Sequence, residues 1–137
     1  MWAAYALISA VFAALTSILV KIGLADVNSN LATAIRTVVV LVMAWVVVFA
    51  TGAQSGLEGI NRRGLLFIAL SGVATGASWL FYFRALQLGP ASKVIPIDRA
   101  SVVFAMILAF VVLGETITLK TVIGGALIVI GTFVLIL

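Results

Sequence analysis

Three charged residues and a proline share one short stretch of an otherwise apolar segment, residues 93–103 (KVIPIDRASVV). The four are Lys93, Pro96, Asp98 and Arg99. An ionisable side chain inside a membrane costs several kcal/mol, so such residues usually face a cavity or a partner of opposite charge. If the apolar segments of this chain cross a membrane, the stretch is a candidate for contact with a substrate.

Asp98 is the carboxylate that lies deepest in an apolar segment, which makes it the candidate proton carrier. Arg99 follows it directly, and neighbours on a helix point about 100° apart, so the two cannot form an ideal pair with each other. We expect Asp98 to pair with a cation on another helix, either Arg36 or Arg84. A structural ion pair is the alternative, since a nearby cation lowers the pKa of a carboxyl and opposes a proton-carrying role. Proton coupling and facilitated exchange therefore both stay open.

Positive charge dominates the ionisable residues expected inside the spans. Lys93 lies in the first turn of an expected helix, where the positive end of the helix dipole favours an anion. The net charge of these residues is +2, because there are three cations, Arg36, Lys93 and Arg99, and one anion, Asp98. This balance predicts a substrate with an anionic group, such as a carboxylate or a phosphate.

Two aromatic residues, Trp79 and Tyr82, lie in the same expected helix. We expect them to pack against the organic part of the substrate. The alternative is that they belong to the belt of aromatic residues found at membrane interfaces.

The composition excludes several kinds of chemistry. The chain has 137 residues with no cysteine and no histidine, so disulfides, thiolate metal sites and the commonest general base are absent. No hydrolase, redox or phosphoryl-transfer constellation is present, and we expect no metal site, no cofactor and no enzymatic activity. The net charge is +4, and the basic residues are scattered among the expected helix ends. This distribution argues against nucleic acid as a partner.

The positioning elements follow from hydrophobicity. Hydrophobic residues make up 65% of the chain, and the charged residues leave long charge-free runs between them. About 20 apolar residues suffice for a helix to cross a bilayer, and the alternating pattern of barrel strands is absent. We therefore expect an all-α polytopic membrane protein, a single domain over residues 1–137. Its five transmembrane helices are expected at about 2–24, 31–51, 63–86, 91–113 and 119–137.

Pro96 falls inside the fourth expected helix. Proline has no backbone N–H, so the carbonyl of Ser92 loses its helical hydrogen bond. Broken helices are tolerated in membranes where they line protein or a water-filled cavity. We therefore expect a helix break at Pro96 that faces an interior.

Five crossings place the two termini on opposite sides of the membrane, and the basic residues hardly distinguish these sides. The positive-inside rule then does not select an orientation. Either a weaker signal sets one orientation, or the chain inserts both ways and pairs with an inverted copy. The basic residues assigned to the side of the N-terminus are Arg62, Arg63 and Lys120, and those assigned to the other side are Lys21, Arg36, Arg84 and Lys93.

Two helices carry glycines at helix-packing intervals. Gly72 and Gly76 are four residues apart, and Gly124 and Gly131 are seven apart, so each pair lies on one side of its helix. Packing within the chain explains either pair equally well. In a protein of five helices, we expect one of these faces to contact another molecule.

Several short motifs in the second half resemble the EamA repeat of the drug/metabolite transporter superfamily. They are RALQLGPAS at 84–92, Pro96 within the next helix, LGE at 113–115 and GGALIVIG at 124–131. The first half is similar more loosely, including Lys21 and Arg36, so the resemblance covers essentially the whole chain.

The resemblance implies a fold and a function. Most members of that family have ten helices in two inverted five-helix repeats, and this chain corresponds to one repeat. A homodimer, antiparallel in arrangement, is therefore implied. It would act as a small secondary transporter that moves a small-molecule metabolite by alternating access across the lipid bilayer of a prokaryotic inner membrane.

Two other functions are considered. The last helix also resembles that of the small multidrug resistance proteins, which export hydrophobic cations in exchange for protons through a glutamate in their first helix. Residues 2–24 contain no acidic residue, which argues against that mechanism. A membrane scaffold subunit without transport activity is the third alternative, and it predicts charges that pair locally with no cavity.

Overall fold

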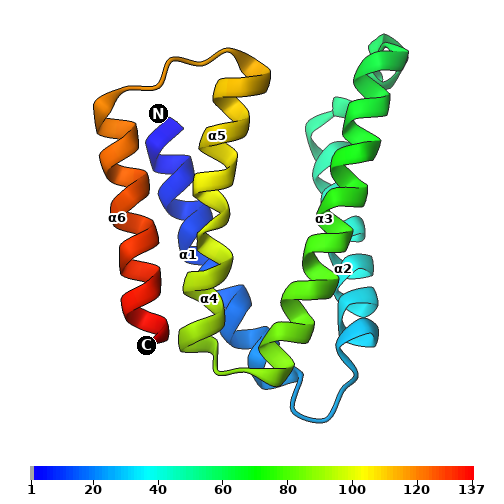
Figure 1. Ribbon diagram of the computed structural model, residues 1–137. Coiled ribbons are helices and arrows are strands. Elements are labelled where there is room, and N and C mark those ends of the chain that lie inside the picture. The colour runs from blue at the N-terminus through cyan, green and yellow to red at the C-terminus, as the bar shows by residue number, and fades with distance from the viewer. Residues whose placement is uncertain (1) are drawn as a thin grey trace. The chain divides into compact units, whose positions relative to one another are not determined.

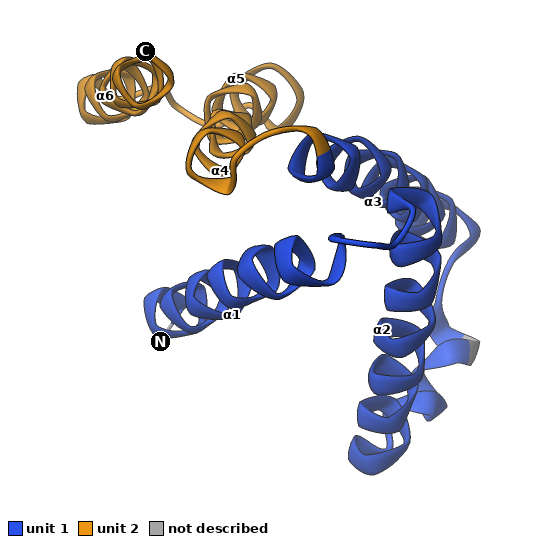
Figure 2. Ribbon diagram, turned by 90° about the horizontal axis from the view of Figure 1, so that it is seen from below, with its two compact units in different colours: residues 1–87 blue, residues 88–137 orange. Residues whose placement is uncertain are grey.

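The computed structural model describes residues 2–137, without the side chain of Glu58. The chain forms two compact units, residues 1–87 and 88–137 (Figure 2). The described residues form helices and connections, with no strand among them. This confirms the all-α class expected from the sequence.

The first unit contains three long helices and one short one (Figure 1). They are α1 (Trp2–Gly23), α2 (Ser29–Thr51), the 3₁₀ helix η1 (Ala53–Gly59) and α3 (Arg62–Leu88). The second unit contains α4 (Ala91–Arg99), α5 (Ser101–Leu113) and α6 (Leu119–Ile136).

Local sequence accounts for most helix ends. The side chain of Asn28 caps α2 by accepting a hydrogen bond from the backbone N–H of Asn30 at 2.9 Å. Thr118 caps α6 in the same way, accepting from the N–H of Thr121 at 3.2 Å. Gly114 ends α5 in the left-handed conformation, with φ 68°, which costs glycine no steric penalty.

The expected helix over 91–113 is interrupted by a single turn residue, Ala100, shortly after Pro96. The N–H of Ala100 is shared between the carbonyls of Pro96, at 3.2 Å, and Ile97, at 3.1 Å. The N–H of Val103 then bonds to the carbonyl of Ala100 at 3.0 Å, three residues back. Tighter i→i+3 bonding therefore joins α4 to α5, and the pair still forms one apolar segment of 23 residues.

Five helical segments are long and apolar enough to cross a membrane, which confirms the expected number of spans. In the most apolar window of each segment, at most 6% of the residues are buried within the structure. The apolar side chains therefore face outward, as they do in an integral membrane protein whose solvent is lipid.

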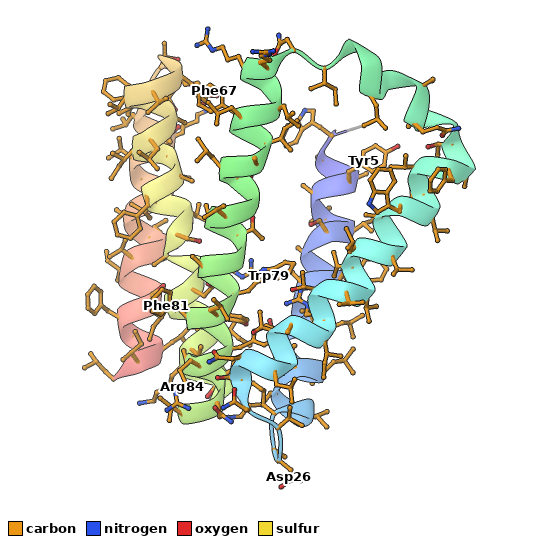
Figure 3. The ribbon with its side chains drawn as sticks, turned by 90° about the vertical axis from the view of Figure 1, so that its right-hand side faces the viewer. Tyr5, Asp26, Phe67, Trp79, Phe81 and Arg84 are labelled. Atoms are coloured by element: carbon orange, nitrogen blue, oxygen red, sulfur yellow. The ribbon has the colours of Figure 1, made fainter. Side chains whose placement is uncertain are left out.

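In the first unit the buried residues gather where the three long helices meet. They are Ser17, Leu24, Ser29, Thr33, Phe83 and Leu86. These positions belong to the C-terminal part of α1, the residue that follows it, the first turns of α2 and the C-terminal part of α3. From this end, near the connection that carries Asp26, α1 and α2 diverge (Figures 2 and 3).

In the second unit α6 packs along both α4 and α5. Gly125 is the buried residue of α6, and a Cβ at its position would lie 3.6 Å from the sulfur of Met106 on α5. The hydroxyl of Thr132 lies 2.8 Å from the carbonyl oxygen of Ile128 and 3.3 Å from that of Pro96. Gly125 thus lies within van der Waals reach of α5, while a threonine links α6 to α4.

Candidate functional site

Arg36 lies in α2 against an aromatic face of α3. Its guanidinium carbon is 4.2 Å from the centroid of the Trp79 ring and 5.3 Å from that of Phe83. Both distances are within the range of cation–π attraction. Trp79 and Phe83 are four residues apart, so they project from the same side of α3. Figure 3 shows Trp79 extending from α3 toward α1 and α2.

The N–H groups of Arg36 have no acceptor among the described side chains and backbone of residues 2–87. The two rings are the contacts of its guanidinium there, and neither a hydrogen bond nor an ion pair joins it to another residue of that range. No buried polar side-chain atom among the described residues lacks a hydrogen-bond partner. Arg36 itself is half-buried, so part of its side chain remains accessible.

A cavity of about 410 Å³ opens beside this arginine, between α1, α2 and α3. Small-molecule sites in proteins commonly occupy about 300 to 1,000 Å³. Its lining contains one charged side chain, that of Arg36, and one hydroxyl side chain, that of Thr16. The lining residues are Thr16, Leu19, Val20, Gly23, Val27, Ala32, Ile35, Arg36 and Phe83.

Tyr82 links α3 to α1 beside the cavity. Its phenolic O–H donates to the Oγ of Ser17 at 2.7 Å, and the Ser17 hydroxyl donates to the carbonyl of Ala13 at 2.9 Å. Ser17 is buried, so this pair satisfies polar groups that would otherwise be costly in the membrane. Tyr82 therefore positions the cavity wall and does not itself line the cavity.

The C-terminal end of α3 is held by three further polar contacts. The Nζ of Lys21 donates to the carbonyl of Leu86 at 2.5 Å. The side-chain amide of Gln87 donates to the carbonyl of Val27 at 3.1 Å and accepts from the guanidinium of Arg84 at 3.0 Å. Arg84, which the sequence offered as a partner for Asp98, thus has a partner on its own helix.

The remaining candidates, Lys93, Asp98 and Arg99, belong to the second unit. The Nζ of Lys93 donates to the carbonyl of Ile136 at 2.5 Å, which uses one of its three donors. Asp98 is half-buried, and Arg99 is exposed. Whether Asp98 meets a cation of α2 or α3 concerns both units and stays a prediction.

The glycine faces expected to pack are open in the structure. A Cβ at Gly72, Gly76, Gly124 or Gly131 would meet no atom within 4 Å, apart from the local helix backbone. Their role in packing therefore stays a prediction. Gly125, beside one of them, is the glycine in close contact with a neighbouring helix.

Phe83, Ser17 and Thr16 are not among the candidates that the sequence indicates. Phe83 could have been found, because it follows Trp79 by one helical turn and so faces the same side. Ser17 and Thr16 gave no comparable signal, since a hydroxyl residue in an apolar helix commonly bonds to its own backbone. Only the approach of α1 to α3 gives them their roles.

A family model for the EamA-like transporter family matches the chain over residues 1–137. A curated relative from Sinorhizobium sp, named an uncharacterized transporter in the cobO 3'region, is 48% identical over 134 residues. That match covers 98% of this chain and 95% of the relative, so the two have closely similar lengths. No solved structure matches the chain.

Proposed function

The chain belongs to the EamA-like transporter family, and from that premise we propose that it is a secondary transporter of a small organic metabolite that carries an anionic group. A membrane transporter is the function that the family and the curated relative support. The anionic substrate and the mechanism, alternating access, are the further steps of the proposal.

The observation that carries the proposal is the guanidinium of Arg36 at the cavity, which has no hydrogen-bond acceptor among the described residues of its own unit. Holding an arginine inside an apolar span is unfavourable unless it has a partner or a function. Within its own unit the partners are two aromatic rings, which attract the cation but accept none of its hydrogen bonds. An anion of the substrate supplies the missing acceptors.

Alternating access requires a site that opens to each side in turn, and inverted repeats are a common means to that end. We propose that two copies of this chain pair in opposite orientations to form such a structure. Three features support the pairing: the odd number of spans, the nearly equal basic residues on the two sides, and a curated relative of similar length. Gly72 and Gly76 of α3 are candidates for its interface.

Lys93, Asp98 and Arg99 in the α4 segment of the second unit are proposed to contact the substrate at another stage of transport, outside the Arg36 cavity. The shared N–H of Ala100 and the missing N–H of Pro96 leave backbone carbonyls there with weakened helical bonding. Such a segment suits a water-filled passage.

Flux through reconstituted vesicles tests the transport function. Proteoliposomes that contain the full chain are loaded with a panel of radiolabelled organic acids, and the efflux of each acid is measured. Arg36→Gln is the variant, and Arg63→Gln is the matched control. Arg63 also lies near an aromatic ring, because its guanidinium carbon is 5.9 Å from the centroid of the Phe67 ring. Unlike Arg36, it does not line the cavity. The proposal would be contradicted if no acid left these proteoliposomes faster than it leaves vesicles without protein.

Labelling of introduced cysteines tests the inverted pair, because the native chain has none. Gln54→Cys places a thiol in the exposed η1 segment. We expect a membrane-impermeant maleimide to label it from both faces of the membrane, in intact cells and in inverted vesicles. Labelling from a single face would exclude dual insertion.

A further inference from the structure

The cavity beside Arg36 points to a narrower class of ligand than an anion in general. We infer that it takes an organic monoanion, a single carboxylate on an apolar body that carries no ammonium group. This inference rests on the proposed function and names the substrate class of that same site.

Charge balance sets the number of ionised groups. The cavity lining has one cation, Arg36, and no acidic residue. One carboxylate neutralises that cation, whereas a second anionic group would enter an apolar environment without a counter-charge. The ammonium of an amino acid would likewise lack a carboxylate in the lining. A monoanion is the ionic form that this lining accommodates at least cost.

The shape of the guanidinium suits a carboxylate. Its N–H donors form a planar fork that matches the two oxygens of a carboxylate, and such paired bonds are shorter and stronger than neutral ones. The rings of Trp79 and Phe83, at 4.2 and 5.3 Å, restrict where the guanidinium lies. Because the rings accept no hydrogen bond of that fork, its donors stay available to the ligand.

The walls define the rest of the ligand. Leu19, Val20 and Ile35 line the cavity with aliphatic side chains, and Phe83 adds an aromatic one. Thr16 supplies the hydroxyl side chain of this lining. A sugar or a nucleotide would leave many hydroxyl and amide groups without partners there, each at a cost. An aliphatic or aromatic body fits the walls without such losses.

The test compares probes that share one body and differ in charge. They are 3-phenylpropanoate, 3-phenylpropan-1-ol, phenylalanine and 2-benzylsuccinate, which are respectively a monoanion, a neutral alcohol, a zwitterion and a dianion. The full chain is placed in lipid nanodiscs with Trp2→Phe and Trp45→Phe, which leaves Trp79 as the remaining tryptophan of the three. Its fluorescence reports occupation of the cavity.

We expect 3-phenylpropanoate to bind about tenfold or more tightly than each of the other probes, the gain typical of a hydrogen bond to a charged group. Arg36→Gln should remove the advantage of the acid over the alcohol, and Arg63→Gln should keep it. Arg36→Lys retains the charge but loses the planar fork, so it should keep part of the advantage of the acid over the alcohol. This variant replaces Arg36→Gln in the test if Arg36→Gln does not fold. Equal binding of acid and alcohol in the unsubstituted site would overturn the inference, as would an unchanged preference in a folded Arg36→Gln protein.

Flux separates this inference from the proposed function. If 3-phenylpropanoate binds as expected but does not cross proteoliposomes that contain the chain, the ligand class stands and the transport of that class is refuted. If another ligand is transported while 3-phenylpropanoate shows no Arg36-dependent binding, the transport function stands and the ligand class is refuted.

Discussion

In residues 2–87 the half-buried Arg36 lies against aromatic rings, whereas in residues 88–137 three charged residues lie within three positions of a proline, Pro96. Arg36 enters an unbroken helix, and the rings of Trp79 and Phe83 stabilise it where water is scarce. Asp98 and Arg99 lie in α4, just before the helix is interrupted at Ala100. One unit thus accommodates charge by side-chain contacts, and the other places charge where backbone bonding is altered.

The two units nevertheless fasten a helix end in the same way. Lys21 donates to the carbonyl of Leu86 near the end of α3, and Lys93 donates to the carbonyl of Ile136 at the end of α6, both at 2.5 Å. The C-terminal end of a helix carries partial negative charge and unpaired carbonyls, which a lysine satisfies. The units therefore differ in the chemistry of their interiors and agree in the stabilisation of their ends.

The largest expected effect contrasts the two charged regions. Arg36→Gln should lower the transport rate by about tenfold or more, because it removes a charge-assisted bond to the substrate. Arg99→Gln should lower it less, since Arg99 is exposed and has other charged residues beside it. Initial rates in proteoliposomes, normalised to folded protein, measure both. A larger loss in Arg99→Gln would shift the main binding role to the second unit.

Packing should differ between adjacent glycines of α6. Gly125→Leu should destabilise the protein by about 1–3 kcal/mol, the usual cost of overpacking, because a Cβ there already lies 3.6 Å from Met106. Gly124→Leu is the matched control, since its Cβ meets nothing within 4 Å. Thermal unfolding of both variants in detergent measures the difference. Equal destabilisation would mean that α5 and α6 do not pack as described.

Removal of one hydroxyl tests the link between α1 and α3. Tyr82→Phe should destabilise the first unit by about 1 kcal/mol, because it removes the hydrogen bond to the buried Ser17. Tyr5→Phe is the control, since the side chain of Tyr5 is 73% exposed. Denaturant unfolding followed by Trp79 fluorescence gives the comparison. An identical midpoint for the two variants would remove the structural role assigned to Tyr82.

The smallest effects concern the two lysines at helix ends. Lys21→Met and Lys93→Met should each lower stability by about 0.3–1 kcal/mol, the size of a charge interaction with a helix end. Lys120→Met is the control, because Lys120 lies in the first turn of α6, where a cation is unfavourable. It should leave stability unchanged or raise it slightly. Equal losses in all three would show that lysine removal acts through the membrane interface instead.

Much of the fold follows from local sequence. The charge-free apolar runs predict the five spans, and residues such as Asn28 and Thr118 explain where helices begin. The two ends of each of the five apolar segments lie within two residues of their expected positions. Apolar length and capping act over a few residues, so one sequence suffices to recognise them.

The site was predictable only in part. A charge and an indole within apolar helices suggest function, which makes Arg36 and Trp79 candidates from sequence. The structure places the guanidinium carbon of Arg36 4.2 Å from the centroid of the Trp79 ring. The interruption after Pro96 was expected at the proline itself and lies at Ala100. The shift follows from the hydrogen-bond pattern, since the N–H of Ala100 is the one shared between Pro96 and Ile97.

By itself, the sequence determined the membrane environment, the number of helices and the residue types able to bind an anion. Those properties depend on composition and on neighbours along the chain. Only the tertiary structure decided that Phe83 joins Trp79 against Arg36, that Tyr82 bonds to Ser17, and that an open cavity of about 410 Å³ adjoins them. Such contacts join helices far apart in sequence, and their geometry depends on how those helices cross.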